Sequence, residues 1–342
     1  MKRIKYRPVL LFFLIFTLFF LSGFMLLPRL NISGIHLPGE AVFVCAEPMF
    51  SRPSLLFSAL PLPLSEPTPE ATSSPTPAQV PKPTEVPSSP AVYAPEPATD
   101  GDGLLIKNST DYSVDTSALL SAPISLGEGQ PKVLIVHTHT SEAYTQSEDY
   151  PYTPSDSYRT EDPAYNICRV GQALAESLEI NGISALHDTT SHDYPSYSGC
   201  YGRSLETMKQ NLALHPDIDV IIDLHRDALA DPSGGYLKTE AEINGKKIAQ
   251  ALVVIGTDAG GLEHPNWQKN LSLGLKVQQT LCTLYPGLAR PLHLRTERFN
   301  GHAAEGALLI EIGSNGNTME EALETASLVG HALAETLKQL CP

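Results

Sequence analysis

The sequence predicts an α/β domain over residues 121–342: a three-layer sandwich whose mainly parallel sheet is flanked by helices, with a β-hairpin insertion. Two observations carry this prediction. Apolar, β-branched runs alternate with amphipathic helical segments, which is the order that parallel strands require. The dipeptide Asn244-Gly245 separates two further strand-like runs, 236–243 and 246–256, and is typical of a two-residue hairpin turn.

The elements follow one another along the chain with recognisable ends. The expected strands are 132–137, 183–186, 218–224, 292–298 and 307–312, and the expected helices are 163–181, 202–214, 264–284 and a closing helix after residue 318. The first helix has Asp162 as its N-cap and Pro163 at its first position, and Gly182 ends it. Thr318 and Glu321 form a capping box for the closing helix.

The N-terminus has the pattern of a membrane anchor. Residues 1–8 are basic, and residues 9–28 form an uncharged apolar run long enough to cross a bilayer as a helix. The basic flank predicts a cytoplasmic N-terminus, a single pass through the cell membrane and an extracytoplasmic domain. A cleaved signal peptide is the alternative, but the apolar run is long for a signal and no clean A-x-A site follows it.

Residues 29–120 are expected to be an extracytoplasmic, largely disordered linker. Fourteen of the 29 prolines lie between residues 47 and 102, interleaved with Ser, Thr, Ala and Glu. Such a segment has too little apolar surface to form a core, and its prolines favour an extended chain.

Composition excludes several classes of function. The formal charge of −15 argues against nucleic-acid binding. The five cysteines are odd in number and lack C-x-x-C spacing, so they indicate neither a disulfide framework nor a cysteine zinc site. The chain also lacks a G-x-S-x-G elbow, a P-loop, a G-x-G-x-x-G turn after a strand and an H-E-x-x-H helix.

Imidazoles and carboxylates follow two of the predicted strands. His137, His139 and Glu142 come after the strand 132–137, and His225 ends the strand that begins near residue 218. One His/Glu/His set is the three-ligand pattern that leaves a fourth zinc position open for catalysis. His139, Glu142 and His225 are therefore the expected Zn²⁺ ligands, with His137 as a neighbour or as the ligand in place of His139.

Glu311 is a carboxylate inside the otherwise apolar strand 307–312. Burial of an unpaired carboxylate is costly, so either a polar partner or a function is expected. We interpret Glu311 as the catalytic acid and base beside the metal site. Arg226, Asp227 and His302 are weaker candidates for substrate contacts, as are the three residues Tyr144, Arg295 and Arg298.

Three segments resemble a known family. HTHTSEAY at 137–144, DLHRDA at 223–228, and GALLIEIG at 306–313 with the following Asn317-Thr318 are similar to stage II sporulation protein P (SpoIIP) of endospore-forming bacteria. The last two segments also resemble the wider group of zinc-dependent N-acetylmuramoyl-L-alanine amidases. The resemblance covers roughly residues 130–342.

The resemblance implies an amidase-like fold and a cell-wall hydrolase of sporulation. Its implied substrate is peptidoglycan, cut between N-acetylmuramic acid and L-alanine and also at peptide cross-links during forespore engulfment. The implied partners are a SpoIID-like lytic transglycosylase and a SpoIIM-like membrane protein. In the wider amidases the glutamate ligand lies just before the first long helix, which would favour Glu161 over Glu142. A metal-dependent endopeptidase that cuts only cross-links and a non-catalytic wall-binding module are the alternatives.

Overall fold

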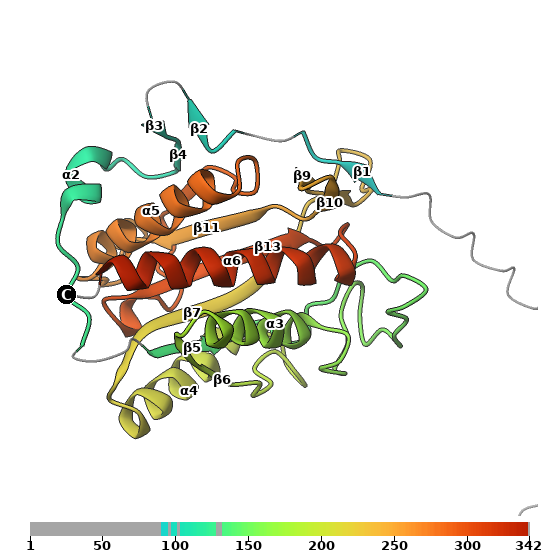
Figure 1. Ribbon diagram of the computed structural model, residues 1–342. Helices are drawn as coiled ribbons and strands as arrows, with labels where there is room; N and C mark the ends of the chain where they lie inside the picture. Colours follow the sequence, from blue (N-terminus) through green and yellow to red (C-terminus); the bar gives the residue numbers. More distant parts are fainter. Residues whose placement is uncertain (1–89, 95–96, 101–102, 128–131, 341–342) are drawn as a thin grey trace, which may run out of the picture. The chain divides into compact units, whose positions relative to one another are not determined.

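The computed structural model describes residues 90–94, 97–100, 103–127 and 132–340, all within one compact unit, Val80–Pro342 (Figure 1). The predicted cytoplasmic segment, the apolar run 9–28 and most of the predicted linker lie outside these residues. No helix within the described ranges is both long and apolar enough to cross a membrane.

A seven-stranded sheet forms the centre of the fold. Its strands are β4 (Ile106–Asn108), β5 (Lys132–Val136), β6 (Ser184–His187), β7 (Ile218–Asp227), β11 (Ala251–Gly256), β12 (Leu292–Arg295) and β13 (Ala307–Ser314). Their spatial order is β4-β12-β11-β13-β7-β5-β6. β11 and β13 are antiparallel, and the other neighbouring pairs are parallel. The predicted mainly parallel sheet is confirmed.

Helices cover the two faces of this sheet unequally. α3 (Ile167–Ile180), α5 (Trp267–Leu284) and α6 (Met319–Leu340) lie on one face (Figure 1). They pack on alternate residues such as Ile135, Leu224 and Ile310 in the main hydrophobic core. α4 (Cys200–Leu214) packs through Met208 on the opposite face, over β5 and β7. The three-layer prediction is therefore confirmed, but α4 leaves the β11–β12 side of its face open.

The hairpin turn forms at the predicted dipeptide. β9 (Ala241–Ile243) and β10 (Lys246–Ile248) are antiparallel, and Asn244 and Gly245 have φ angles of 55° and 77°. Asn and Gly tolerate this left-handed backbone, which a two-residue hairpin turn requires. The hairpin is shorter than predicted, because residues 251–256 leave it and enter the central sheet as β11.

Ordered structure begins earlier than the predicted boundary at residue 121. β1 (Ala91–Val92) pairs with β8 (Leu237–Lys238), β2 (Thr99–Asp100) pairs with β3 (Gly103–Leu104), and β4 pairs with β12. α2 (Thr116–Ser121) lies beside α5, where Ser272 Oγ donates to Leu119 O. These strands are two or three residues long, too short for a periodic pattern, and β1 and β4 pair with strands that are distant in sequence.

The helix ends show one correction and one confirmation. α3 begins at Ile167 rather than near 163, since Asn166 Oδ1 accepts a hydrogen bond from Cys168 N at 2.9 Å. The predicted cap Asp162 instead closes its own turn by accepting from Ala164 N. The capping box of α6 is confirmed: Thr318 N donates to Glu321 Oε2 at 3.1 Å, and Glu321 N donates to Thr318 Oγ1 at 3.4 Å.

Candidate active site

The carboxyl ends of β5, β7 and β13 meet at a cavity of about 420 Å³. Neighbouring parallel strands end at the same edge of a sheet, which brings residues distant in sequence together there. His139, Glu142, His225 and Glu311 all line this cavity. Glu311 and His225 are direct neighbours in the register of β13 and β7.

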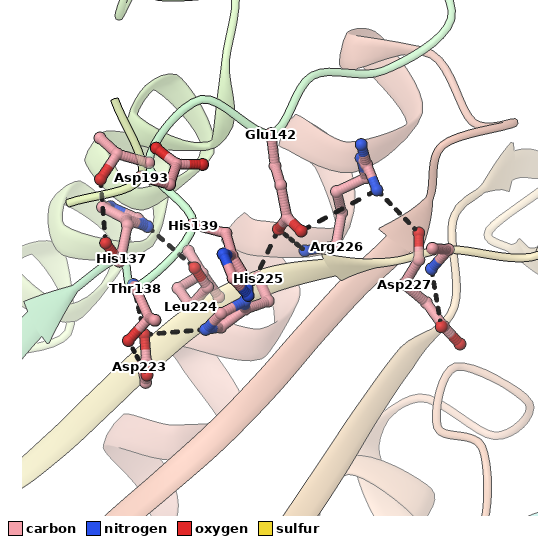
Figure 2. Close-up of polar contacts among 12 residues, drawn as sticks. His137, Thr138, His139, Glu142, Asp193, Asp223, Leu224, His225, Arg226 and Asp227 are labelled. Carbon is pink, nitrogen blue, oxygen red and sulfur yellow. Dashed lines mark hydrogen bonds and ion pairs between the residues drawn. The ribbon is translucent and has the colours of Figure 1, made fainter. Parts of the chain in front are cut away.

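His225 lies between two carboxylates (Figure 2). Its Nδ1 is 3.6 Å from Glu142 Oε2, and its Nε2 is 2.9 Å from Asp223 Oδ1. The second contact has the distance of an ion pair but not the alignment of a hydrogen bond. Burial opposes protonation, yet the two carboxylates outweigh it and raise the pKa of His225 well above its usual value. His225 must lose this proton before it can donate to a metal ion.

Glu142 is buried and ionised. Burial alone would raise the pKa of Glu142, but the charges of Arg226 and His225 lower it to about 2. Arg226 N donates to Glu142 Oε2 at 3.1 Å, and Arg159 Nη2 lies 3.7 Å from Glu142 Oε1. An acceptor-only carboxylate is thus fixed beside an imidazole, as a metal ligand requires.

His139 sits over the cavity in an aromatic setting. Its ring stacks on Tyr197 with centroids 4.7 Å apart and lies edge-on to His225 at 5.2 Å. Its Nε2 is 3.2 Å from the Tyr197 hydroxyl, and its Nδ1 is 3.7 Å from Cys200 Sγ. Burial lowers the pKa of His139 to about 4, so this imidazole is neutral near neutral pH.

Glu311 differs from Glu142 in charge state. Burial is the main cause that raises the pKa of Glu311 to about 8, and His225 opposes this rise. The side chain keeps some exposure to the cavity, while Oε2 itself is buried without a hydrogen-bond partner in the described part of the chain. A carboxyl group that titrates near neutral pH beside an open cavity is suited to proton transfer.

The donor set fits zinc in kind. Two imidazoles and a carboxylate form a three-ligand site of the catalytic type. Two ligands of a tetrahedral zinc ion lie about 3.4 Å apart, which is close to the 3.6 Å between His225 Nδ1 and Glu142 Oε2. In the described ranges, however, no group of three or more His, Cys, Asp or Glu side chains is arranged to hold a metal ion. His139 would be the third ligand. To reach the metal, its ring must move away from Tyr197.

The structure does not bring His137 to the cavity. Its Nδ1 lies 2.9 Å from Leu224 O and its Nε2 lies 2.8 Å from His187 Nε2, so both ring nitrogens are engaged behind the site. Residues two apart share a face of a continuous strand, but β5 ends at Val136 and the chain turns before His139. Glu161 is exposed and absent from the cavity lining, so Glu142 is the glutamate that the structure offers.

The weaker candidates have varied places. The Arg226 guanidinium donates to Ala143 O and Tyr158 O and so holds the loop that carries Glu142, although it also lines the cavity. Asp227 and Arg295 line the cavity, whereas Tyr144, Arg298 and His302 do not. Tyr144 is buried and donates to Ile312 O, and His302 is in the 3-10 helix Gly301–Ala303.

Several residues around the cavity were not predicted. Asp223 accepts hydrogen bonds from Thr138 N and Oγ1 at 2.8 and 2.6 Å as well as facing His225. Its position two residues before His225 on one strand could have indicated it, because such residues share a face. The cavity residues Tyr93, Lys107, Tyr197, Arg290 and His293 carry no local signal of function.

The profile of stage II sporulation protein P matches residues 72–334. Stage II sporulation protein P of Bacillus subtilis (strain 168) is 25% identical over 214 residues, which are 59% of this chain and 50% of that relative. The match thus spans about half the length of the curated relative.

Among solved structures, the CwlD amidase from Clostridioides difficile in complex with the GerS lipoprotein is similar, with a TM-score of 0.38 and 10% identity. The match covers 62% of this chain and 98% of that one. An N-acetylmuramoyl-L-alanine amidase from Clostridium difficile 630 has a TM-score of 0.33 and 19% identity over 62% of this chain and 94% of that one. Because the family profile covers well over half of the sequence, the chain belongs to the stage II sporulation protein P family.

Proposed function

We propose that this chain is a zinc-dependent peptidoglycan hydrolase that cleaves the amide bond between N-acetylmuramic acid and L-alanine. One observation carries the proposal: His139, Glu142 and His225 surround one open cavity together with a carboxyl group, Glu311, that titrates near neutral pH. Membership of the sporulation family and the peptidoglycan amidases among similar structures are consistent with this substrate. Cleavage of peptide cross-links is a second activity that we propose for the same site.

In this proposal His139, Glu142 and His225 hold the metal. The chemistry that a bound zinc ion supplies is Lewis acidity, which polarises the scissile carbonyl and makes a water molecule easier to deprotonate. In its ionised form, Glu311 accepts the proton of the attacking water and returns it to the leaving nitrogen. Asp223 fixes the ring of His225 from the far side, and Arg226 fixes the carboxylate of Glu142.

The cellular setting is also part of the proposal. The apolar run 9–28 would anchor the chain in the cell membrane with its domain outside, and the Pro-rich segment would let the domain reach the wall. Forespore engulfment is the proposed process, with a SpoIID-like transglycosylase and a SpoIIM-like membrane protein as partners.

The activity is tested with the full-length protein in mild detergent on purified sacculi, with and without chelator. Mass spectrometry should find stem peptides that are released from the glycan and begin with a free L-alanine amine. A chelator should abolish their release. Products cut only at cross-links would replace the amidase proposal by an endopeptidase. Absence of metal-dependent products from both bonds would overturn the hydrolase proposal.

Metal content tests the ligands independently of activity. We expect His139→Ala and His225→Ala to lose bound zinc and His137→Ala to keep it. His331→Ala, in α6 and away from the cavity lining, is the matched control. Loss of zinc from His137→Ala with retention in His139→Ala would show that the ligand assignment is wrong. Glu311→Ala should retain zinc and lose hydrolysis.

A further inference from the structure

One wall of the cavity is built from four basic residues. Lys107, Arg290, His293 and Arg295 all line it, on the side of β4 and β12 away from β7. Lys107 and His293 are direct neighbours in the register of β4 and β12, and Arg290 lies just before β12 begins. We call these four residues the basic wall.

Arg290 is a buried, pre-positioned cation in this wall. Its side chain is 8% exposed, Nη1 lies 2.7 Å from Asp227 Oδ2, and the guanidinium carbon lies 5.3 Å from the centre of the Tyr93 ring. Its Nε is buried and makes no hydrogen bond in the described ranges. A guanidinium fixed by an ion pair and an aromatic face, with donor capacity left, is ready to bind an oxyanion.

Lys107 supplies a second charge, and this one is uncompensated. Its side chain is exposed at the cavity, and no ion pair to it is found among the described residues. Arg295 is held by Glu297 through two contacts of 3.0 and 3.1 Å and contributes less net charge. Such a concentration of positive charge is unusual in a chain whose formal charge is −15.

The charges act together at His293. Its ring accepts or donates one hydrogen bond with Ser109 Oγ at 2.9 Å. Burial, and after it the charges of Arg295, Lys107 and Arg290, lower the pKa of His293 to about 4. The neutral imidazole therefore leaves the lysine and arginine charges to set the potential of this wall.

The opposite end of the cavity is acidic. Glu142, from the loop after β5, and Glu311, from β13, line this end beside His225, and the Glu142 carboxylate would repel an anionic group on a ligand. The cavity floor between the two ends is apolar and consists of Leu252, Val254, Leu309 and Phe299. A ligand that carries a neutral reacting amide and a distant carboxylate would therefore bind in one orientation. Its amide would lie at the acidic end of the cavity and its carboxylate at the basic wall.

We propose that the basic wall is a subsite for a carboxylate of the substrate's peptide, located about three residues from the scissile amide. The inference rests on the proposed function, whose substrate carries an acidic peptide beyond the cleaved bond. The spacing follows from the sheet: β12 is two strands from β13, roughly 10 Å at about 4.8 Å a strand, and an extended peptide advances about 3.3 Å per residue. Arg290 and Lys107 therefore act as specificity residues and not in the chemical step.

The test compares two muramoyl tripeptides that differ only in amidation of the carboxylate on the third residue. For the full-length wild-type protein we expect kcat/KM to be roughly tenfold higher on the free carboxylate, the ratio that one charge-assisted hydrogen bond provides. Lys107→Gln should reduce this preference to about twofold, mainly through a higher KM for the free carboxylate. Lys209→Gln, an exposed lysine of α4, is the matched control.

Equal kcat/KM on the two substrates, or an equal loss on both in Lys107→Gln, would overturn the subsite. Failure of the wild type to cleave either substrate would instead overturn the proposed function. In that event, fluorescence anisotropy with the two labelled peptides decides the subsite separately. A Kd ratio near tenfold that Lys107→Gln abolishes would support it, and equal Kd values would refute it.

Discussion

The substitution Glu311→Gln is expected to abolish hydrolysis and to stabilise the metal-free protein at high pH. Burial raises the pKa of Glu311 from 4.5 to about 8, so the folded state disfavours its ionised form. Below pH 4.5 the carboxyl group is protonated in both the folded and the unfolded chain, and folding carries no electrostatic cost. Between pH 4.5 and about 8 the unfolded chain releases the proton while the folded chain retains it. Stability of the wild type therefore falls as the pH rises through this window.

The difference between the two pKa values corresponds to about 5 kcal/mol at most. Part of the Glu311 side chain contacts solvent in the cavity, and this screening reduces the cost, so we expect Glu311→Gln to gain about 2 kcal/mol at pH 8.5. Glutamine has nearly the same shape and does not titrate.

The assay is urea unfolding of chelator-treated protein at pH 4.5, 6.5 and 8.5, with Glu176→Gln as the control. Glu176 is an exposed carboxylate on α3, and its substitution should not alter the pH profile. A gain for Glu311→Gln that is the same at all three pH values, or a loss at pH 8.5, would refute the argument from burial.

Three further substitutions test the surroundings of the site. Asp223→Asn removes the carboxylate behind His225 and should lower zinc affinity about 10- to 100-fold, as measured by competition with a chromogenic chelator; unchanged affinity would exclude its positioning role. Gly171→Ala would place a Cβ 2.6 Å from His137 Nε2, and we expect a net loss of about 1–2 kcal/mol in urea unfolding, because overpacking exceeds the gain in helix propensity. Asn317→Ala leaves buried groups around its six side-chain hydrogen bonds unsatisfied, so thermal and urea unfolding should show a loss of about 2–4 kcal/mol; a smaller loss would mean that water replaces the amide.

The sequence alone was sufficient to predict the sheet, the long helices and the meeting of the candidate site residues at one edge of the sheet. Long apolar runs determine where strands and helices form, and the parallel arrangement determines that β5, β7 and β13 end together. Local sequence signals were sufficient to predict the hairpin turn at Asn244-Gly245 and the capping box of α6. Each of these features depends on residues close together in the chain.

Features that depend on distant contacts were not predicted. Asp162-Pro163 and Asn166 are both plausible helix starts, and only the packing of the loop after β5 selects Asn166. The position of His137 depends in the same way on Leu224 O and His187, which lie on other strands. β4 has three residues, and its partner in the sheet is almost two hundred positions away.

The direction of β11 explains why a basic wall can face an acidic centre. Because β11 runs antiparallel to β13, the strands β11, β12 and β4 reach the cavity from the opposite direction to β5, β7 and β13. The residues they bring there come from β4, from the start of β12 and from the loop before it, and these include Lys107, Arg290 and His293. α4 packs on the same face over β5 and β7, away from the strands that carry Lys107 and His293. Lys107 is exposed at the cavity, whereas Arg290 is buried against Asp227. One reversal of strand direction and one uncovered half-face thus give the sheet separate places for the proposed bond cleavage and for the proposed carboxylate subsite.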